Sequence, residues 1–107
     1  MIFKGKVSNS DEWIWGYQVD NNKIKNIKDN EIYEVDLYSI CSGSGVLDKN
    51  NNEIFEGDIL KIRDSEYDVV EFYQGMFLTS KDKKPLSAYN AKELYIIGYS
   101  YKEKEAE

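Results

Sequence analysis

Two acidic side chains near the middle of the chain have the spacing that acid–base chemistry uses. Glu56 and Asp58 flank Gly57, and residues two apart on a strand share a face. Paired carboxylates can divide the roles of acid and base in hydrolysis. A simpler reading makes Asp58 a turn residue, whose carboxylate accepts backbone N–H groups where the chain enters a strand. We therefore favour a structural role for Glu56, Gly57 and Asp58, and keep a carboxylate-based hydrolase as an alternative.

A calcium loop is the second chemistry that the spacing suggests. Asp48, Asn50 and Asn52 match the first three ligands of such a loop. The loop then needs glycine at its sixth position and glutamate at its twelfth, where this chain has Glu53 and Ile59. Asp and Asn also hydrogen-bond their own backbone in turns. The sequence therefore predicts a polar hairpin turn here, and no metal site.

An aromatic stripe offers a binding surface rather than a reaction. Trp13, Trp15 and Tyr17 alternate along a predicted strand and share one face. We favour a core position for them, because each ring buries a large apolar area. The alternative is a platform on which bases or a peptide stack, with Lys4 and Lys6 as nearby cations. Acidic residues flank the strand and weaken that alternative: Asp11, Glu12 and Asp20.

The densest basic cluster of the chain lies in the segment 81–84. Its three lysines are interrupted by Asp82, so a solvated loop is favoured over a phosphate contact. With the two tryptophans, these lysines complete the candidate interaction surface, which consists of Trp13, Trp15, Lys81, Lys83 and Lys84.

The composition excludes several classes of function. The 107 residues contain no histidine, so a Ser-His or Cys-His nucleophile pair cannot be built from this chain alone. The single cysteine, Cys41, rules out an intrachain disulfide and is expected to be a small buried hydrophobe. The net charge of −6 opposes broad binding to phosphate backbones. No apolar run approaches the roughly 20 residues of a membrane span, so we expect a cytoplasmic protein. We also expect no cofactor.

Short alternating runs predict a chain built almost entirely of strands. The expected strands cover residues 2–7, 12–19, 23–27, 31–37, 58–63, 67–73, 76–79 and 94–99, with at most one short helix near 85–93. Gly16 inside a strand indicates a bulge or the close approach of a neighbouring backbone. Gly75 indicates a tight hairpin with positive φ. Residues 42–45, Ser-Gly-Ser-Gly, indicate a flexible joint between an N-terminal hairpin layer (1–40) and C-terminal barrel-like strands (45–101), before a solvated tail (102–107).

Residues 45–59 carry a resemblance to a known family. They read GVLDKNNNEIFEGDI and match the pattern tGlkDknGkeIyEGDIv of the YopX family of small phage and prophage proteins. Residues 3–6 and 12–16 resemble the FRGK and EWvyG elements of that family, and residues 86–90 and 96–98 resemble pLseyn and vIGn. Asn51 stands in place of the turn glycine, which Asn can replace because it tolerates the left-handed region. Tyr99 and Ser100 depart from the start of the terminal NIYE element.

The resemblance implies a mainly β, barrel-like domain, a phage context and self-association, and it implies no activity and no catalytic residues. Together with the residue patterns, it predicts a small, partly open β-barrel-like domain. The function we expect is that of a non-enzymatic accessory module that contacts itself, as a homo-oligomer, or another phage or host protein. A nucleic-acid-associated module is the first alternative and the hydrolase is the second.

Overall fold

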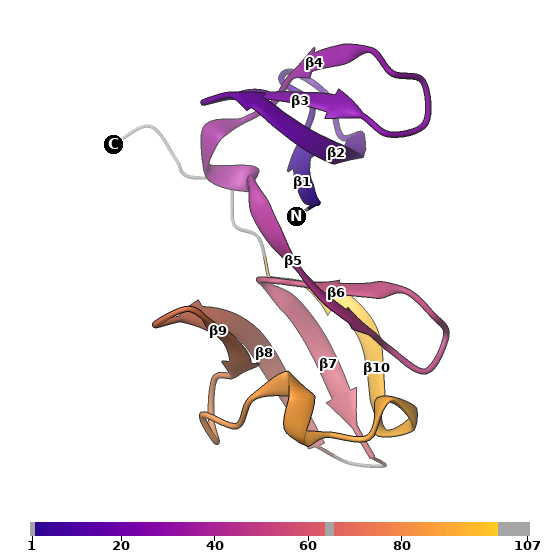
Figure 1. Ribbon diagram of the computed structural model, residues 1–107, viewed down its shortest axis with the longest axis vertical. Coiled ribbons are helices and arrows are strands. Elements are labelled where there is room, and N and C mark those ends of the chain that lie inside the picture. Colours follow the sequence, from indigo (N-terminus) through magenta and orange to yellow (C-terminus); the bar gives the residue numbers. More distant parts are fainter. Residues whose placement is uncertain (1, 64–65, 101–107) are drawn as a thin grey trace. The chain divides into compact units, whose positions relative to one another are not determined.

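The computed structural model describes residues 2–63 and 66–100, so the predicted tail at 102–107 lies outside the described residues. The prediction of a mainly β chain is confirmed, since the described residues form ten strands and three short 3-10 turns and contain no α-helix (Figure 1). The strands are β1 Phe3–Lys6, β2 Trp13–Asp20, β3 Lys23–Asn26, β4 Ile32–Glu34, β5 Cys41–Leu47, β6 Glu53–Phe55, β7 Asp58–Ile62, β8 Glu66–Tyr73, β9 Met76–Thr79 and β10 Leu94–Tyr99. The 3-10 turns are η1 Leu37–Ser39, η2 Leu86–Ala88 and η3 Ala91–Glu93, so two such turns replace the predicted short helix near 85–93.

None of the helical segments in the described part of the chain is long and apolar enough to cross a membrane.

The strands form two antiparallel sheets, neither of which closes. One sheet has the order β4-β3-β2-β1-β5-β6 and the other the order β10-β7-β8-β9. The chain divides between Ser42 and Gly43 into an N-terminal unit, residues 2–42, and a C-terminal unit, residues 43–63 and 66–100. The segment 42–45, which we predicted to be a flexible joint, is instead part of strand β5. Cys41 and Ser42 pair with β1, whereas Gly43 and Leu47 pair with β6.

The N-terminal unit has a small apolar core. Ile14 of β2, Ile24 of β3 and Val35 are almost fully buried, and four partly buried residues pack on them: Phe3, Val7, Tyr33 and Ile40. A single antiparallel bridge from Val7 to Val35 joins the ends of β1 and β4 without closing the sheet.

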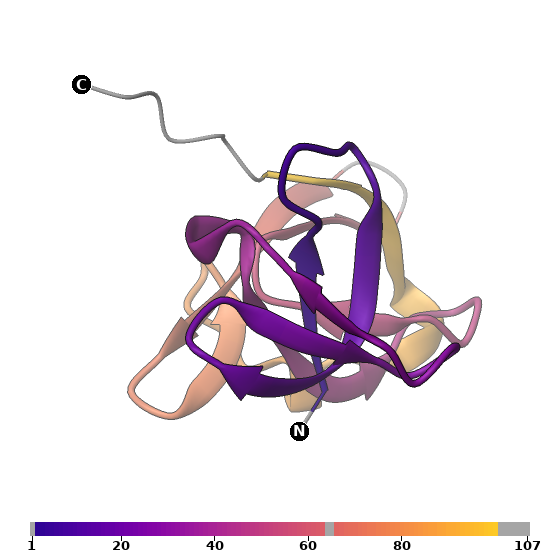
Figure 2. The ribbon, with the colours of Figure 1, turned by 90° about the horizontal axis from the view of Figure 1, so that it is seen from above.

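Gly16 fixes how the strands of the N-terminal unit approach one another. A Cβ atom at Gly16 would lie 1.8 Å from the carbonyl oxygen of Lys25, so only glycine permits this approach of β3 to β2. The N–H of Ile27 donates to the carbonyl of Trp15 at 2.9 Å at the same place, where the β2–β3 hairpin can be followed from two sides (Figures 1 and 2). The prediction of a close backbone approach at Gly16 is confirmed.

The C-terminal unit has the larger core. Its buried members come from β6, β7, β8, β10 and η2, namely Ile54, Leu60, Ile62, Val70, Leu86 and Leu94. The turns that join these strands use the left-handed region where we predicted it: φ is +65° at Asn51 and +80° at Gly75. Gly57, with φ +89°, makes the bend between β6 and β7.

Candidate interaction surfaces

Two of the three aromatic residues of the β2 stripe are exposed, so the core position that we favoured is wrong for them, whereas Trp13 is partly buried. Trp15 and Tyr17 are 39% and 54% exposed, whereas Ile14, between the two tryptophans, is 2% exposed and belongs to the core. Gly16 lies on the same inward face as Ile14, at a place where a side chain would meet the backbone of β3.

The strand register shows which residues accompany the stripe. Directly opposed residues of paired strands share a face, and Lys25 of β3 lies opposite both Tyr17 of β2 and Ile32 of β4. Ile32 is 57% exposed, and Val19 further along β2 is also exposed. This outward surface, which we call the aromatic face, consists of Trp15, Tyr17, Val19, Lys25 and Ile32.

Lys4 and Lys6 of β1 lie on the same side, opposite Trp15 and Trp13 respectively. The Lys4 side chain is largely buried, and its Nζ lies 5.6 Å from the centroid of a Trp13 ring. Lys6 forms an ion pair with Asp36 at 3.3 Å. The two cations that we expected beside the stripe are therefore present, and each is engaged within the N-terminal unit.

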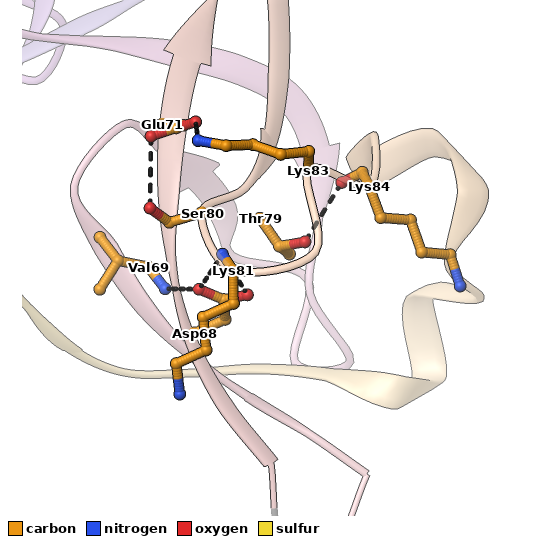
Figure 3. A network of polar contacts seen from close by, with 8 residues as sticks. All are labelled: Asp68, Val69, Glu71, Thr79, Ser80, Lys81, Lys83 and Lys84. Atoms are coloured by element: carbon orange, nitrogen blue, oxygen red, sulfur yellow. Dashed lines mark hydrogen bonds and ion pairs between the residues drawn. The ribbon is translucent and has the colours of Figure 1, made fainter.

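Each lysine of the predicted basic cluster makes a contact within the C-terminal unit (Figure 3). The Nζ of Lys81 donates to the carbonyl of Tyr67 at 2.9 Å, and Lys83 pairs with Glu71. Lys84 lies over the ring of Tyr89, with its Nζ 4.2 Å from the ring centroid. The cluster serves to hold the loop after β9, and it belongs to a different unit from Trp13 and Trp15.

The contacts of the Glu71 carboxyl lower its pKa. The hydrogen bond from Lys83 holds the pKa of the Glu71 carboxyl below its usual value, and a hydrogen bond from Ser80 acts in the same direction.

Asp68 anchors the same loop, and the sequence patterns did not single it out. Its carboxylate is almost fully buried and accepts the N–H of Lys81 at 3.1 Å and that of Val69 at 2.8 Å (Figure 3). The sequence did contain a signal for this role. Asp68 lies two positions before the buried Val70, so the alternation of β8 turns this acidic residue inward.

The calcium-like run forms a turn around Asp48. One oxygen of the buried Asp48 carboxylate accepts the N–H groups of Asn50 and Asn52, at 2.9 and 3.0 Å. The other oxygen accepts the N–H of Ile96 in β10 at 3.1 Å. In the described residues no three acidic or cysteine side chains gather as metal ligands would. The turn thus fastens the β5–β6 connection to strand β10.

The Glu56-Gly57-Asp58 corner is also held by backbone contacts. Asp58 is 2% exposed, and its Oδ2 accepts the N–H of Phe55 at 2.7 Å. The N–H of Gly57 donates to Val70 and its carbonyl accepts from Ser100, both at 2.8 Å. Glu56 is half-buried beside them. The hydrolase alternative would require a carboxylate pair open to substrate, whereas Asp58 points into the turn.

Cys41 is buried, and its Sγ donates to the carbonyl of Ser39 at 3.2 Å.

A second outward surface, in the C-terminal unit, was not predicted. Lys61 of β7 lies directly opposite Tyr95 of β10 on one side and Tyr67 of β8 on the other. Tyr95 is 36% and Tyr67 is 48% exposed. The register of three strands creates this row, which no single segment reveals. We call it, together with Lys49 and Lys81, the tyrosine–lysine face.

Comparison with known proteins identifies the family of the chain but finds no similar individual protein. No curated protein and no solved structure matches it. The family described as YopX protein matches residues 3–105, which is nearly the whole chain. The chain therefore belongs to the YopX family, a phage-associated family of small proteins.

Proposed function

We propose that this protein is a non-enzymatic accessory module that binds another protein, or a second copy of itself, through the aromatic face. The observation that carries the proposal is the row Tyr17–Lys25–Ile32, which runs across three strands with two strongly exposed apolar side chains. With Trp15 and Val19 beside Tyr17, several exposed apolar side chains gather on this face, and gathered apolar surface marks interaction sites in soluble proteins.

The mixture of side chains favours a protein as the partner. Val19 and Ile32 offer aliphatic surface, which packs well against protein side chains but gives nucleic-acid bases no ring to stack on. Trp15 and Tyr17 belong to the residue types that dominate binding energy at protein interfaces.

The carboxylate geometry supports the non-enzymatic part of the proposal. Asp48, Asp58 and Asp68 are buried, and each accepts backbone N–H groups that hold a turn or a loop in place. The chain has no histidine to act as a base near neutral pH.

The test is a double variant of the aromatic face, Tyr17→Ser with Ile32→Ser. Sedimentation velocity measures self-association, and cross-linking in phage-infected cells followed by mass spectrometry identifies another partner. Loss of two central apolar contacts should weaken the association at least tenfold, because interface hot spots each contribute more than about 1 kcal/mol.

The matched control is Tyr73→Ser with Met76→Ser, at the tip of the β8–β9 hairpin. Tyr73 is as exposed as Tyr17, at 54%, but lies in the other unit. The control should associate like the wild type. A strictly monomeric protein with no cross-linked partner, or equal loss in both double variants, would refute the proposal.

A further inference from the structure

We propose that the tyrosine–lysine face of the C-terminal unit is a second binding site, and that its ligand is single-stranded nucleic acid. The site is separate from the aromatic face of the proposed function, because all of its residues lie in the C-terminal unit. It also differs from the candidate surface that the sequence predicted, with which it shares only Lys81.

The core of the argument is the row Tyr95–Lys61–Tyr67. The two rings flank a lysine across three adjacent strands, and neighbouring strands are about 4.8 Å apart, so the two tyrosines stand about 10 Å from each other. Unpaired bases stack on aromatic rings regardless of sequence, while a cation nearby contacts the phosphate. The row thus offers two stacking positions with a positive charge between them.

Two further lysines extend the positive charge on either side. The Nζ of Lys49 lies 4.5 Å from the centroid of the Tyr95 ring, and Lys81 reaches over to the carbonyl of Tyr67. A lysine resting on a ring can swing to a phosphate when a base takes its place, because its stem is flexible.

Two of the acidic side chains near this face are already engaged. Glu71 follows Tyr67 on the same side of β8 and is paired with Lys83. Asp68 is buried and accepts backbone N–H groups. Two exposed acids, Glu66 and Asp82, line a hollow with Tyr67 and Lys81, so the face sets the three lysines Lys49, Lys61 and Lys81 against these two acids.

A shallow hollow beside Tyr67 completes the site. It encloses about 270 Å³ and is lined by Ile59, Tyr67, Asp68, Val69, Ser80 and Lys81. Its apolar walls, with the Lys81 side chain, the Ser80 hydroxyl and Asp68, which accepts backbone N–H groups, suit a planar base with polar edges.

Stacking distinguishes this ligand from its competitors. A duplex keeps its bases stacked inside, so it would meet the lysines but not the rings. An acidic peptide without aromatic side chains would pair with the lysines and leave the ring faces unstacked. Unpaired nucleotides use both features of the row.

The experiment titrates a fluorescein-labelled oligothymidylate with the full chain at low salt and follows fluorescence anisotropy. Binding should weaken as salt rises, with a log–log slope of about −2 for three lysine–phosphate contacts. The double variant Tyr67→Leu with Tyr95→Leu keeps apolar side chains on the strands but removes the rings, and it should bind about tenfold more weakly or worse.

Lys61→Gln tests the charge without disturbing the rings, and it should reduce the slope by about 0.7. Two controls, Lys92→Gln in η3 and Tyr17→Leu on the aromatic face, should bind like the wild type. Because Tyr17→Leu alters only the aromatic face, failure of the proposed function and failure of this inference remain distinguishable.

Four results would overturn the inference. The first is no binding at low salt. The second is binding that the tyrosine variants leave unchanged. The third is binding that Lys92→Gln weakens as much as Lys61→Gln. The fourth is competition by a duplex or by polyglutamate as strong as that by unlabelled oligothymidylate, which would point to a ligand recognised by charge alone.

Discussion

The two units of this chain join their strands by different means. In the N-terminal unit, glycine provides space for close packing: a Cβ atom at Gly16 would meet the backbone carbonyl of Lys25, and one at Gly5 would lie 3.0 Å from the Cδ1 of the Ile24 side chain. In the C-terminal unit, the buried carboxylates of Asp48 and Asp58 accept backbone N–H groups from neighbouring segments.

The two units also differ in the size of their cores. The core cluster of the N-terminal unit has three buried apolar residues, and a charged side chain buried in the same unit, Lys4, lies over a Trp13 ring. The core cluster of the C-terminal unit has six buried apolar residues, and three carboxylates that hold turns or loops are buried in that unit. The larger core is thus accompanied by buried carboxylates that specify turns, and the smaller one by the close fit at Gly16.

The largest loss of stability is expected at Gly16, where the fold leaves no space for a side chain. Gly16→Ala places a methyl group against the Lys25 carbonyl, so β2 and β3 must separate, and the unit should lose about 3 kcal/mol of stability. Both tryptophans of the chain lie in this unit, so tryptophan fluorescence during urea unfolding reports on it directly.

The matched control is Gly98→Ala in β10, where the added methyl group would meet only the Cδ1 of Ile59, at 3.7 Å. That variant should stay within about 1 kcal/mol of the wild type. Equal stability of the two glycine variants would show that the close approach at Gly16 is not what holds the N-terminal unit together.

The second effect should be smaller and should appear in the C-terminal unit. Asp58→Ala leaves the buried N–H of Phe55 without its acceptor, which costs about 2 kcal/mol. Asp58→Asn is the control, since its amide oxygen can still accept that hydrogen bond. Denaturant unfolding followed by circular dichroism measures both. If the Asn variant is as unstable as the Ala variant, the role of Asp58 lies in its charge and not in this hydrogen bond.

Part of the fold could be predicted from the sequence alone. Alternation located eight of the ten strands but missed β5, which is rich in Ser and Gly, and the short β6. Turn chemistry located the positive φ angles at Asn51 and Gly75. Alternation could not choose the inward face of β2, because Ile14 on one face and the tryptophans on the other are both apolar. The burial of Ile14 and Gly16 and the exposure of Trp15 become visible only in the packed unit.

The binding surfaces were harder to predict for a related reason. The lysines of the segment 81–84 are adjacent in sequence, but each has a contact of its own in the fold. The row Tyr95–Lys61–Tyr67 is scattered over three strands in sequence and is continuous only in the sheet. A surface that depends on strand register cannot be found from spacing within one segment.

The smallest effect is expected at the ion pair of Glu71 and Lys83. Glu71 is a surface carboxylate of the C-terminal unit, so it can be compared directly with the buried carboxylates of that unit. The pKa of Glu71 is lower in the folded state than in the unfolded chain, mainly through its hydrogen bond with Lys83. The pair therefore stabilises the fold at pH above the unfolded pKa, and this contribution disappears as pH falls through the folded pKa.

Thermal unfolding of Lys83→Met across an acid-to-neutral pH series measures this contribution. The variant should melt slightly below the wild type at neutral pH, and the difference should shrink in acid. Lys83 also lies 5.9 Å from the centroid of the Tyr73 ring, a contact that does not depend on the charge of Glu71. A difference that stays constant over the whole pH range would thus assign the stabilisation to the ring and not to the carboxylate. Exposed acids of this unit would then contribute nothing measurable, and only its buried carboxylates would distinguish it from the N-terminal unit.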